Sequence, residues 1–423
     1  MTITAVISRT KVQKDASQQQ TQQPMNQNQN QPPPNQQKQH KSQSRKIVFN
    51  ISQNFKVIKV LGEGAYGIVA LAIHLPTNTK VAIKKIEPFE RSLFCLRTLR
   101  EIKLLKKFSN HENLIKLYDI QKPTNYQQFN EVYLIQEYMP SDLHNIIQTH
   151  ILNDQHLQFF IYQILKGLKY IHSSGIIHRD LKPSNILINE HCDLKICDFG
   201  LARIDTIKYN NLNTTANPSI GSTSPEQNKI SLLTEYVATR WYRAPEIMLN
   251  ASNYSTSIDI WSVGCILFEL LTYKAIFPGS DYINQLKLIF EIIGTPTEED
   301  LEIIKSKRAK NFLKSLPKKF KVNFSEFCLN HPIRKIKHRN ISNEINPLCI
   351  DLLEKMMLFN PEKRISVDDA LKHPYLSNYH DPLDEPTTNL IPLKEFEFDI
   401  EKQNLNIEEL KLQIFEEIMM NKK

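Results

Sequence analysis

Cysteine is scarce in this sequence, and long apolar runs are missing. The chain has six cysteines in 423 residues, and no two of them form a CxxC pair, which excludes a disulfide framework and a zinc ribbon. The longest apolar stretch, Val263 to Phe268, is too short to cross a hydrocarbon core of about 30 Å. The N-terminal residues contain no apolar signal-peptide core. We therefore expect a soluble protein of the cytoplasm, with entry into the nucleus left open.

An excess of one charge is also missing from most of the chain. The formal net charge is +8, but residues 1–46 contain seven Lys or Arg and one acid, which leaves +2 for the other 377 residues. A dedicated nucleic-acid-binding protein needs a basic face on its folded part. The composition argues against that class and leaves contact through the basic tail as an accessory alternative.

The N-terminal tail is rich in amide side chains. Between Gln18 and Lys38, fourteen of 21 residues are Gln or Asn and four are Pro. Such a stretch has no apolar face to offset the entropy lost on ordering. We predict that residues 1–48 are disordered.

After the tail, the chain has mostly strand-like patterns at first and mostly helix-like patterns later. Alternating or β-branched runs predict strands at 55–61, 68–73, 80–84, 114–120 and 132–137, and apolar spacing near 3.6 predicts a helix at 92–108. Further helices are expected at 154–172, 258–271, 282–293, 348–357, 367–372 and 407–419. The fold class is therefore α+β, with a small antiparallel-sheet lobe carrying one helix and a larger, mainly helical lobe.

A glycine-rich motif lies between the first two predicted strands. Residues 62–69 read GEGAYGIV, which is a GxGxxGxV pattern. Glycines in such a loop let backbone N–H groups approach phosphates without a Cβ in the way. The motif alone is weak, because an ordinary hairpin turn fits it equally well.

Four further elements follow in a fixed order. A strand lysine, Lys84, precedes a helix glutamate, Glu101, by seventeen residues. The segment HRDLKPSN places Asp180 and Asn185 five residues apart, Asp198-Phe199-Gly200 follows, and Ala244-Pro245-Glu246 ends the series. Each element has an unremarkable structural reading, such as a solvated ion pair, but chance does not explain the whole set.

These motifs resemble the signature set of the protein kinases, and the resemblance extends from Phe55 to Tyr379. It implies the two-lobed kinase fold, with lobes at 49–140 and 141–379, an activation segment at 198–246 and a C-terminal docking segment at 380–423. It also implies ATP and Mg²⁺ as cofactors. The implied catalytic residues are Lys84, Glu101, Asp180 and Lys182, and the implied metal ligands are Asn185 and Asp198.

The same resemblance implies the nucleotide pocket. Its members would be Leu61, Gly62, Glu63, Gly64, Ala65, Tyr66, Gly67, Val69, Ala82, Lys84, Gln136, Glu137, Met139, Asp142 and Leu187. Val69, Ala82 and Leu187 would sandwich the base, Gln136 would be the gatekeeper, and Asp142 would lie near the ribose. The apolar members fit an ordinary core equally well.

The activation segment resembles that of the ERK-type mitogen-activated protein kinases. Thr234-Glu235-Tyr236 stands ten residues before Ala244 and continues into VATRWYRAPE. The resemblance implies phosphorylation of Thr234 and Tyr236, each phosphate adding about −1.5 to −2 charge. The implied phosphate ligands are Arg100, Arg179 and Arg203 for the threonine and Arg240 and Arg243 for the tyrosine, with surface charge as the alternative.

Three more matches concern support and docking. Asp259 would hold the catalytic loop, and Arg364 would pair with Glu246. Residues 379–386 resemble an acidic docking site for basic peptides, with Asp381, Asp384 and Glu385 as its acids. The last helix would pack back on the small lobe.

Three segments depart from the family pattern. The loop from Ile204 to Leu233 is longer than in close family members and contains Ser224-Pro225. We interpret its extra length as a tolerated insertion without function, rather than as an autophosphorylation target. Residues 329–346 insert a basic segment that includes Arg334. The Gln/Asn-rich tail has no family counterpart.

The sequence therefore predicts a monomeric, proline-directed Ser/Thr kinase that is switched on by an upstream dual-specificity kinase and switched off by phosphatases. Such regulators would bring basic docking peptides. The alternatives are a cyclin-dependent-like kinase and a catalytically silent docking scaffold. The Thr/Tyr pair and the acidic docking motif argue against the cyclin-dependent type.

Overall fold

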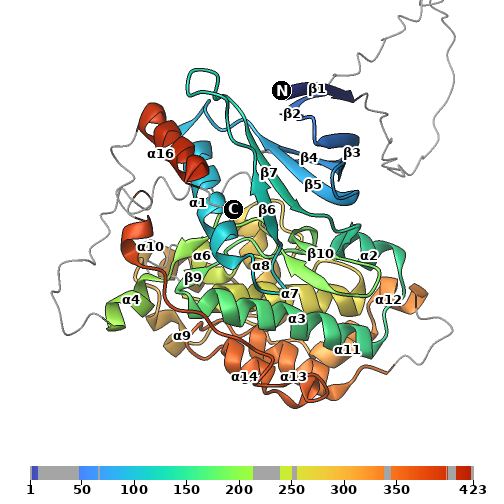
Figure 1. Cartoon of the computed structure of the whole chain (residues 1–423). Helices are drawn as coiled ribbons and strands as arrows, with labels where there is room; N and C mark the ends of the chain where they lie inside the picture. The colour runs from blue at the N-terminus through green and yellow to red at the C-terminus, as the bar shows by residue number, and fades with distance from the viewer. Residues whose placement is uncertain are drawn as a thin grey trace, which may run out of the picture.

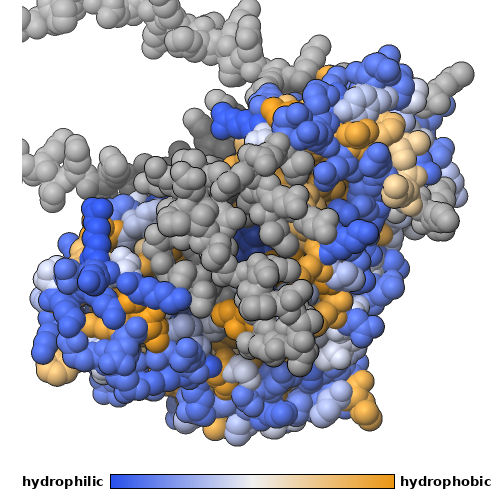
Figure 2. All heavy atoms as spheres, turned by 90° about the vertical axis from the view of Figure 1, so that its left-hand side faces the viewer, coloured by the Kyte–Doolittle hydropathy of each residue, from blue (hydrophilic) through white to orange (hydrophobic). Residues whose placement is uncertain are grey.

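A computed structural model gives the fold of this chain (Figure 1). It describes residues 47–64, 67–212, 239–249, 255–337, 344–396, 398 and 406–420, and the backbone of residues 2–7. Figure 2 shows hydrophilic side chains over most of the described surface on one side of the molecule, with smaller apolar groups between them. Among the described residues, no helix combines the length and apolar content that a membrane span requires.

The small lobe is built on a five-stranded antiparallel sheet in the order β3-β4-β5-β7-β6. Its strands are β3 (Phe55–Gly64), β4 (Gly67–His74), β5 (Thr79–Ile86), β6 (Leu117–Ile120) and β7 (Val132–Glu137). All five were expected, although β6 begins three residues later than predicted. The small lobe of the predicted α+β fold is therefore confirmed.

A two-stranded ribbon corrects part of the prediction for the tail. Strand β1 (Thr2–Ile7) pairs antiparallel with β2 (Ile47–Ser52), so disorder over the whole of 1–48 was wrong at 2–7 and 47–48. Residues 8–46 lie outside the described part. The physical reason is the apolar alternation of β2, which buries Ile47, Phe49 and Ile51 against the sheet.

Two helices pack together on the small lobe. Helix α1 (Ser92–Phe108) has the predicted bounds, and the final helix α16 (Ile407–Met419) lies beside it (Figure 1). The Glu417 carboxylate accepts from Lys106 Nζ at 2.6 Å and from Lys103 Nζ at 3.0 Å. The expected return of the last helix to the small lobe is confirmed.

The large lobe is mainly helical, as predicted. Its helices are α2 (Leu143–Thr149), α3 (Asp154–Ser173), α4 (Thr206–Leu212), α6 (Pro245–Met248), α7 (Ser257–Thr272), α8 (Tyr282–Ile293), α9 (Glu298–Glu302), α10 (Lys307–Ser315), α11 (Phe324–Leu329), α12 (Pro332–Lys337), α13 (Pro347–Met356) and α14 (Val367–Leu371). Short strands also occur: β8 (Ser141–Asp142), β9 (Ile176–Ile177), β10 (Ile186–Ile188), β11 (Leu194–Ile196) and β12 (Arg203–Ile204). Helix α7 is apolar on nearly all sides, and its residues from Ile258 to Thr272 are buried, so it forms the centre of this lobe.

Two of the departures from the family pattern are partly described. The long loop begins with α4, and the remainder up to Leu233 lies outside the described residues. The basic insert is not only a loop, because α12 forms within it. Its Pro332 stands at the first helical position, where the missing N–H is tolerated.

A buried ion pair connects the end of the activation segment to the large lobe. Arg364 donates to both carboxylate oxygens of Glu246, at 2.8 and 3.2 Å, and its side chain is fully buried. It also donates to the backbone oxygens of Ser257, Leu358 and Phe359. The pairing predicted from the sequence is confirmed.

We expect Arg364→Ala to lower the free energy of unfolding by about 3–5 kcal/mol, because it leaves the Glu246 carboxylate buried without its cation. Urea unfolding followed by circular dichroism measures this change. Lys314→Ala is the control, because the Lys314–Glu298 pair, 2.7 Å long, lies in solvent. A stability loss in the control as large as that of Arg364→Ala would contradict the assignment.

Candidate active site

A cavity of about 980 Å³ brings the predicted site residues together. Its lining includes the predicted residues Leu61, Gly62, Glu63, Gly64, Gly67, Val69, Ala82, Lys84, Glu101, Gln136, Glu137, Met139, Asp142, Asp180, Lys182, Asn185, Leu187 and Asp198. Ala65 and Tyr66 lie outside the described residues. Residues from the sheet, α1 and the large lobe therefore line one space.

The lysine on β5 and the glutamate on α1 form a short ion pair. Lys84 Nζ lies 2.5 Å from Glu101 Oε1, and both side chains are largely buried. Burial alone would lower the pKa of Lys84, but the charges of Glu101 and Asp198 outweigh it and raise that pKa above its ordinary value. Lys84 is therefore a fixed cation inside the cavity, suited to holding an anionic group.

The loop after β9 is held by one buried carboxylate of α7. Asp259 accepts from the backbone N–H groups of His178 and Arg179, both at 2.8 Å, and lies 2.9 Å from His172 Nε2. Arg179 has a φ of 67°, a left-handed conformation that is uncommon for a non-glycine residue. Asp259 fixes this unusual backbone and so directs the next residue, Asp180, into the cavity.

Asp180 is the centre of a small polar network. Its Oδ2 accepts from Lys182 Nζ at 2.7 Å and from Asn185 Nδ2 at 3.0 Å. Burial raises the pKa of Asp180, and the charge of Lys182 opposes that rise. The carboxylate is thus a positioned proton acceptor with a cation beside it.

Asp198 lines the same cavity, and its backbone is also left-handed, at a φ of 66°. The following Phe199 is fully buried between His178 and Phe108, with ring centroids 5.3 Å apart in both pairs. Burial alone would raise the pKa of Asp198, but Lys84 and Lys182 hold it below its ordinary value. Asp198 is therefore an ionised carboxylate in an enclosed place.

These residues fit a divalent metal and a nucleotide. The donor set consists of the Asp198 carboxylate and the Asn185 side-chain oxygen, which are hard oxygen ligands of the kind that Mg²⁺ prefers. The Asn185 amide nitrogen is already used on Asp180, which leaves its oxygen for the metal. Phosphate oxygens would complete such a site, with Lys84 as their counter-charge.

The wall expected to hold the base comes from facing strands. Ala82 of β5 pairs in register with Gln136 of β7, and Met139 follows in the connection to α2. Leu187 lies on β10, opposite Asp142 of β8. The Asp142 carboxylate also accepts from the Asn145 N–H at 2.8 Å and so caps α2.

The glycine motif serves two different purposes. A Cβ on Gly62 would meet no atom within 4 Å, whereas one on Gly67 would lie 2.3 Å from the Lys85 backbone oxygen. Gly67 is therefore required for the close approach of β4 to β5. The predicted role of the glycines in phosphate approach stays a prediction, and Gly67 has this packing role besides.

Three of the predicted phosphate ligands lie near the backbone after Asp198. Arg100 is buried and donates to Gly200 O at 2.5 Å, Arg179 donates to Leu201 O at 3.4 Å, and Arg203 donates to Ala202 O at 2.8 Å. They come from α1, the catalytic loop and β12. Thr234, their predicted partner, lies outside the described residues.

The other two predicted ligands lie beside α8. Arg240 donates to Ser280 O at 2.6 Å, and Arg243 donates to the Tyr282 hydroxyl at 3.0 Å. Tyr236 lies outside the described residues. The structure therefore describes the arginines of both predicted phosphate sites, whereas the two residues predicted to be phosphorylated lie outside the described part.

The predicted docking acids divide into two kinds. Asp381 and Asp384 are exposed, and Asp384 pairs with Lys166 at 2.5 Å. Glu385 is buried, 2.7 Å from His380 Nδ1 and 3.1 Å from Lys169 Nζ. Its carboxylate is fully buried against two half-buried side chains, so it is not exposed as Asp381 and Asp384 are, and its predicted docking role stays a prediction.

Sequence reasoning missed part of the cavity wall. Ile47 and Val48 of β2, Cys197 and Thr239 also line it. Burial raises the pKa of the Cys197 thiol, which packs against the core and lines the cavity. The alternation of apolar residues at 47, 49 and 51 was the signal that could have placed β2 in the small lobe.

Comparisons with known proteins agree with this geometry. The family model described as protein kinase domain matches residues 55–376. Extracellular signal-regulated kinase 1 of Candida albicans (strain WO-1) is 55% identical over 379 residues, which cover 89% of this chain and 87% of that protein. Mitogen-activated protein kinase PMK1 of Pyricularia oryzae is 54% identical over 378 residues, covering 89% and 97%. Mitogen-activated protein kinase mpkB of Aspergillus fumigatus is 53% identical over 376 residues, with the same two shares. The chain therefore belongs to the protein kinase family and is a serine/threonine kinase of the mitogen-activated type.

Proposed function

We propose that this protein is a proline-directed kinase that transfers the ATP γ-phosphate to Ser or Thr of other proteins within a mitogen-activated protein kinase cascade. The observation that carries the proposal is the Asp180–Lys182–Asn185 network facing Asp198 and Lys84 in one cavity. Phosphoryl transfer depends mainly on positioning and charge neutralisation, and this network supplies both. We place the protein in the cytoplasm.

Each residue has a defined part in the proposed reaction. Asp180 accepts the proton of the substrate hydroxyl, and Lys182 stands beside the transferred group. Lys84, oriented by Glu101, holds the α- and β-phosphates. Asp198 and Asn185 would hold Mg²⁺, which supplies neutralisation of the phosphate charge when it is bound.

The proposed switch is dual phosphorylation of Thr234 and Tyr236. Arg100, Arg179 and Arg203 come from three separate elements, so one phosphate would connect α1, the catalytic loop and β12 through charge-assisted hydrogen bonds. Arg100 lies next to Glu101, the partner of Lys84. Ordering the phosphate site would therefore also hold the ATP-facing ion pair.

We propose that basic docking peptides reach this protein through the exposed carboxylates of Asp381 and Asp384. Asp384 already shares Lys166 with Glu112, each at 2.5 Å. A basic peptide would compete with Lys166 for the Asp384 carboxylate. The upstream kinase, the phosphatases and the substrates are the partners that would carry such peptides.

Asp180→Asn is expected to reduce phosphorylation of a Ser-Pro peptide by about 10³-fold, because a positioned general base contributes about 10²–10⁴-fold. Transfer of labelled phosphate from ATP, with Ser-Ala as the comparison peptide, measures both activity and proline preference. Asp193→Asn is the control, since Asp193 is exposed and, among the residues that the structure describes, its side chain bonds to Asn189. Equal activity of Asp180→Asn and wild type would support the silent scaffold instead.

The double variant Thr234→Ala, Tyr236→Phe is expected to retain ATP binding and to lose activity by about 100-fold after treatment with an upstream kinase. The reason is the loss of the charge-assisted bonds, each worth about 1.5–3 kcal/mol. Nucleotide titration and a peptide assay separate the two effects. Ser224→Ala, in the same loop, should behave like wild type. A fully active double variant would reject the switch while leaving the kinase chemistry intact.

A further inference from the structure

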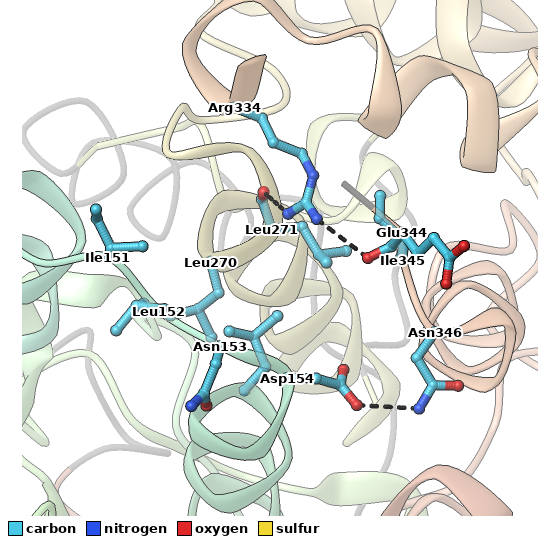
Figure 3. Close-up of a pocket in the computed structure, with 11 residues that line it drawn as sticks. Ile151, Leu152, Asn153, Asp154, Leu270, Leu271, Arg334, Glu344, Ile345 and Asn346 are labelled. Atoms are coloured by element: carbon cyan, nitrogen blue, oxygen red, sulfur yellow. Dashed lines mark hydrogen bonds between the residues drawn. The ribbon is translucent and has the colours of Figure 1, made fainter. Parts of the chain in front are cut away.

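A second cavity lies in the large lobe, away from the nucleotide cleft. Its volume is about 450 Å³, within the range of small-molecule sites, and it shares no lining residue with the cleft. It is enclosed by the start of α3, the end of α7, and two parts of the basic insert, namely α12 and residues 344–346 (Figure 3). The insert that departs from the family pattern thus supplies four of the eleven lining residues, Arg334, Glu344, Ile345 and Asn346.

The wall of this cavity is mostly apolar. Six of its eleven lining residues are aliphatic: Ile151, Leu152, Leu157, Leu270, Leu271 and Ile345. Leu152, Leu157 and both leucines of α7 are buried, whereas Ile151 is 52% exposed and marks the mouth. An apolar group entering here would remove this surface from water.

One side chain of the wall carries a buried charge that forms no ion pair with any residue that the structure describes. Arg334 is only 6% exposed. Among the described residues its partners are two backbone oxygens, Leu271 O at 2.9 Å and Glu344 O at 3.5 Å, and its buried Nε has no acceptor. The Glu344 carboxylate points away from it (Figure 3). Buried charges in proteins are normally paired with an opposite charge.

The other polar end of the cavity is already satisfied. Asp154 accepts from Asn346 Nδ2 at 3.0 Å, from the Tyr375 hydroxyl at 2.9 Å and from Gln158 Nε2 at 2.8 Å. Figure 3 shows Asp154 and Asn346 at a distance from the Arg334 guanidinium, with leucine side chains between them. A ligand would therefore find an anion site at one end only, and a second anionic group would meet the Asp154 carboxylate.

We propose that this cavity binds an amphipathic monocarboxylate, such as a medium-chain fatty acid, with its carboxylate on Arg334 and its apolar body against the leucines of α3 and α7. The remaining N–H groups of the guanidinium are the donors, since two of its five bond to the part of the chain that the structure describes. The site is separate from catalysis and does not depend on the kinase reaction.

Isothermal titration of the full-length protein with decanoate, decanol and acetate tests the proposal. Decanoate is expected to bind, decanol to bind at least about tenfold more weakly, and acetate to show no heat, because both the charge and the apolar body are needed. A saturating non-hydrolysable ATP analogue should leave the decanoate affinity unchanged. Competition with that analogue would place the ligand in the cleft and overturn the proposal.

Two variants locate the binding. Arg334→Met should weaken decanoate binding by about tenfold or more, since hydrogen bonds to charged groups are the strong ones. Lys335→Met is the matched control, because Lys335 is the exposed neighbour on α12 and should bind as wild type does. Ile345→Trp, which fills the cavity from the insert, should abolish decanoate binding while peptide phosphorylation stays at the wild-type level.

Decanoate titration of wild type, Arg334→Met and Ile345→Trp decides whether the cavity is a binding site. If thermal denaturation shows that Arg334→Met is unfolded, Ile345→Trp alone carries the decision. Absence of decanoate binding to wild type at millimolar concentration rejects the site. Undiminished binding to folded Arg334→Met, or to Ile345→Trp, rejects it as well.

Discussion

The active site depends on the buried carboxylate of Asp259. This residue stands on the most enclosed helix of the large lobe and accepts two consecutive backbone N–H groups of the catalytic loop. Burial alone would raise its pKa, but the hydrogen bond from His172 and the nearby donors hold that pKa below the ordinary value, so the carboxylate stays charged. Arg179 keeps a left-handed conformation, which costs about 1–3 kcal/mol, because this carboxylate holds the peptide groups on both sides of His178 in place.

Helix α1 connects the catalytic loop region of the large lobe to the small lobe. Along its length, Glu101 orients Lys84, Arg100 contacts the backbone of Gly200, and Lys106 pairs with Glu417 of the last helix. One rigid element therefore contacts the nucleotide-facing lysine, the start of the activation segment and the C-terminal helix. A shift of α1 would alter all three contacts together. A charge added to the activation segment could in this way affect how Lys84 holds the ATP phosphates.

The sequence predicted the elements with strong periodicity and the residues within fixed motifs. Helices at 92–108, 282–293 and 407–419 and the strand at 132–137 have the predicted bounds, because their apolar spacing is unambiguous over several turns or alternations. The convergence of Asp180, Asn185 and Asp198 on one cavity was predicted from the resemblance to protein kinases that their motifs carry. Motif order could not predict the burial of Glu385, whose carboxylate pairs with Lys169 of the distant helix α3 as well as with the neighbouring His380. The paired strand at 2–7 was also missed. It is only six residues long and precedes a low-complexity tail, so its β pattern did not stand out in the sequence.

The contact between α1 and α16 has a consequence for biosynthesis. The helix that orients Lys84 is supported by residues at 407–419, which leave the ribosome after the whole catalytic domain. A nascent chain can therefore assemble its sheet and its large lobe while α1 still lacks its outer support. The support of α1 is therefore complete only when residues 407–419 have been synthesised and have packed against it.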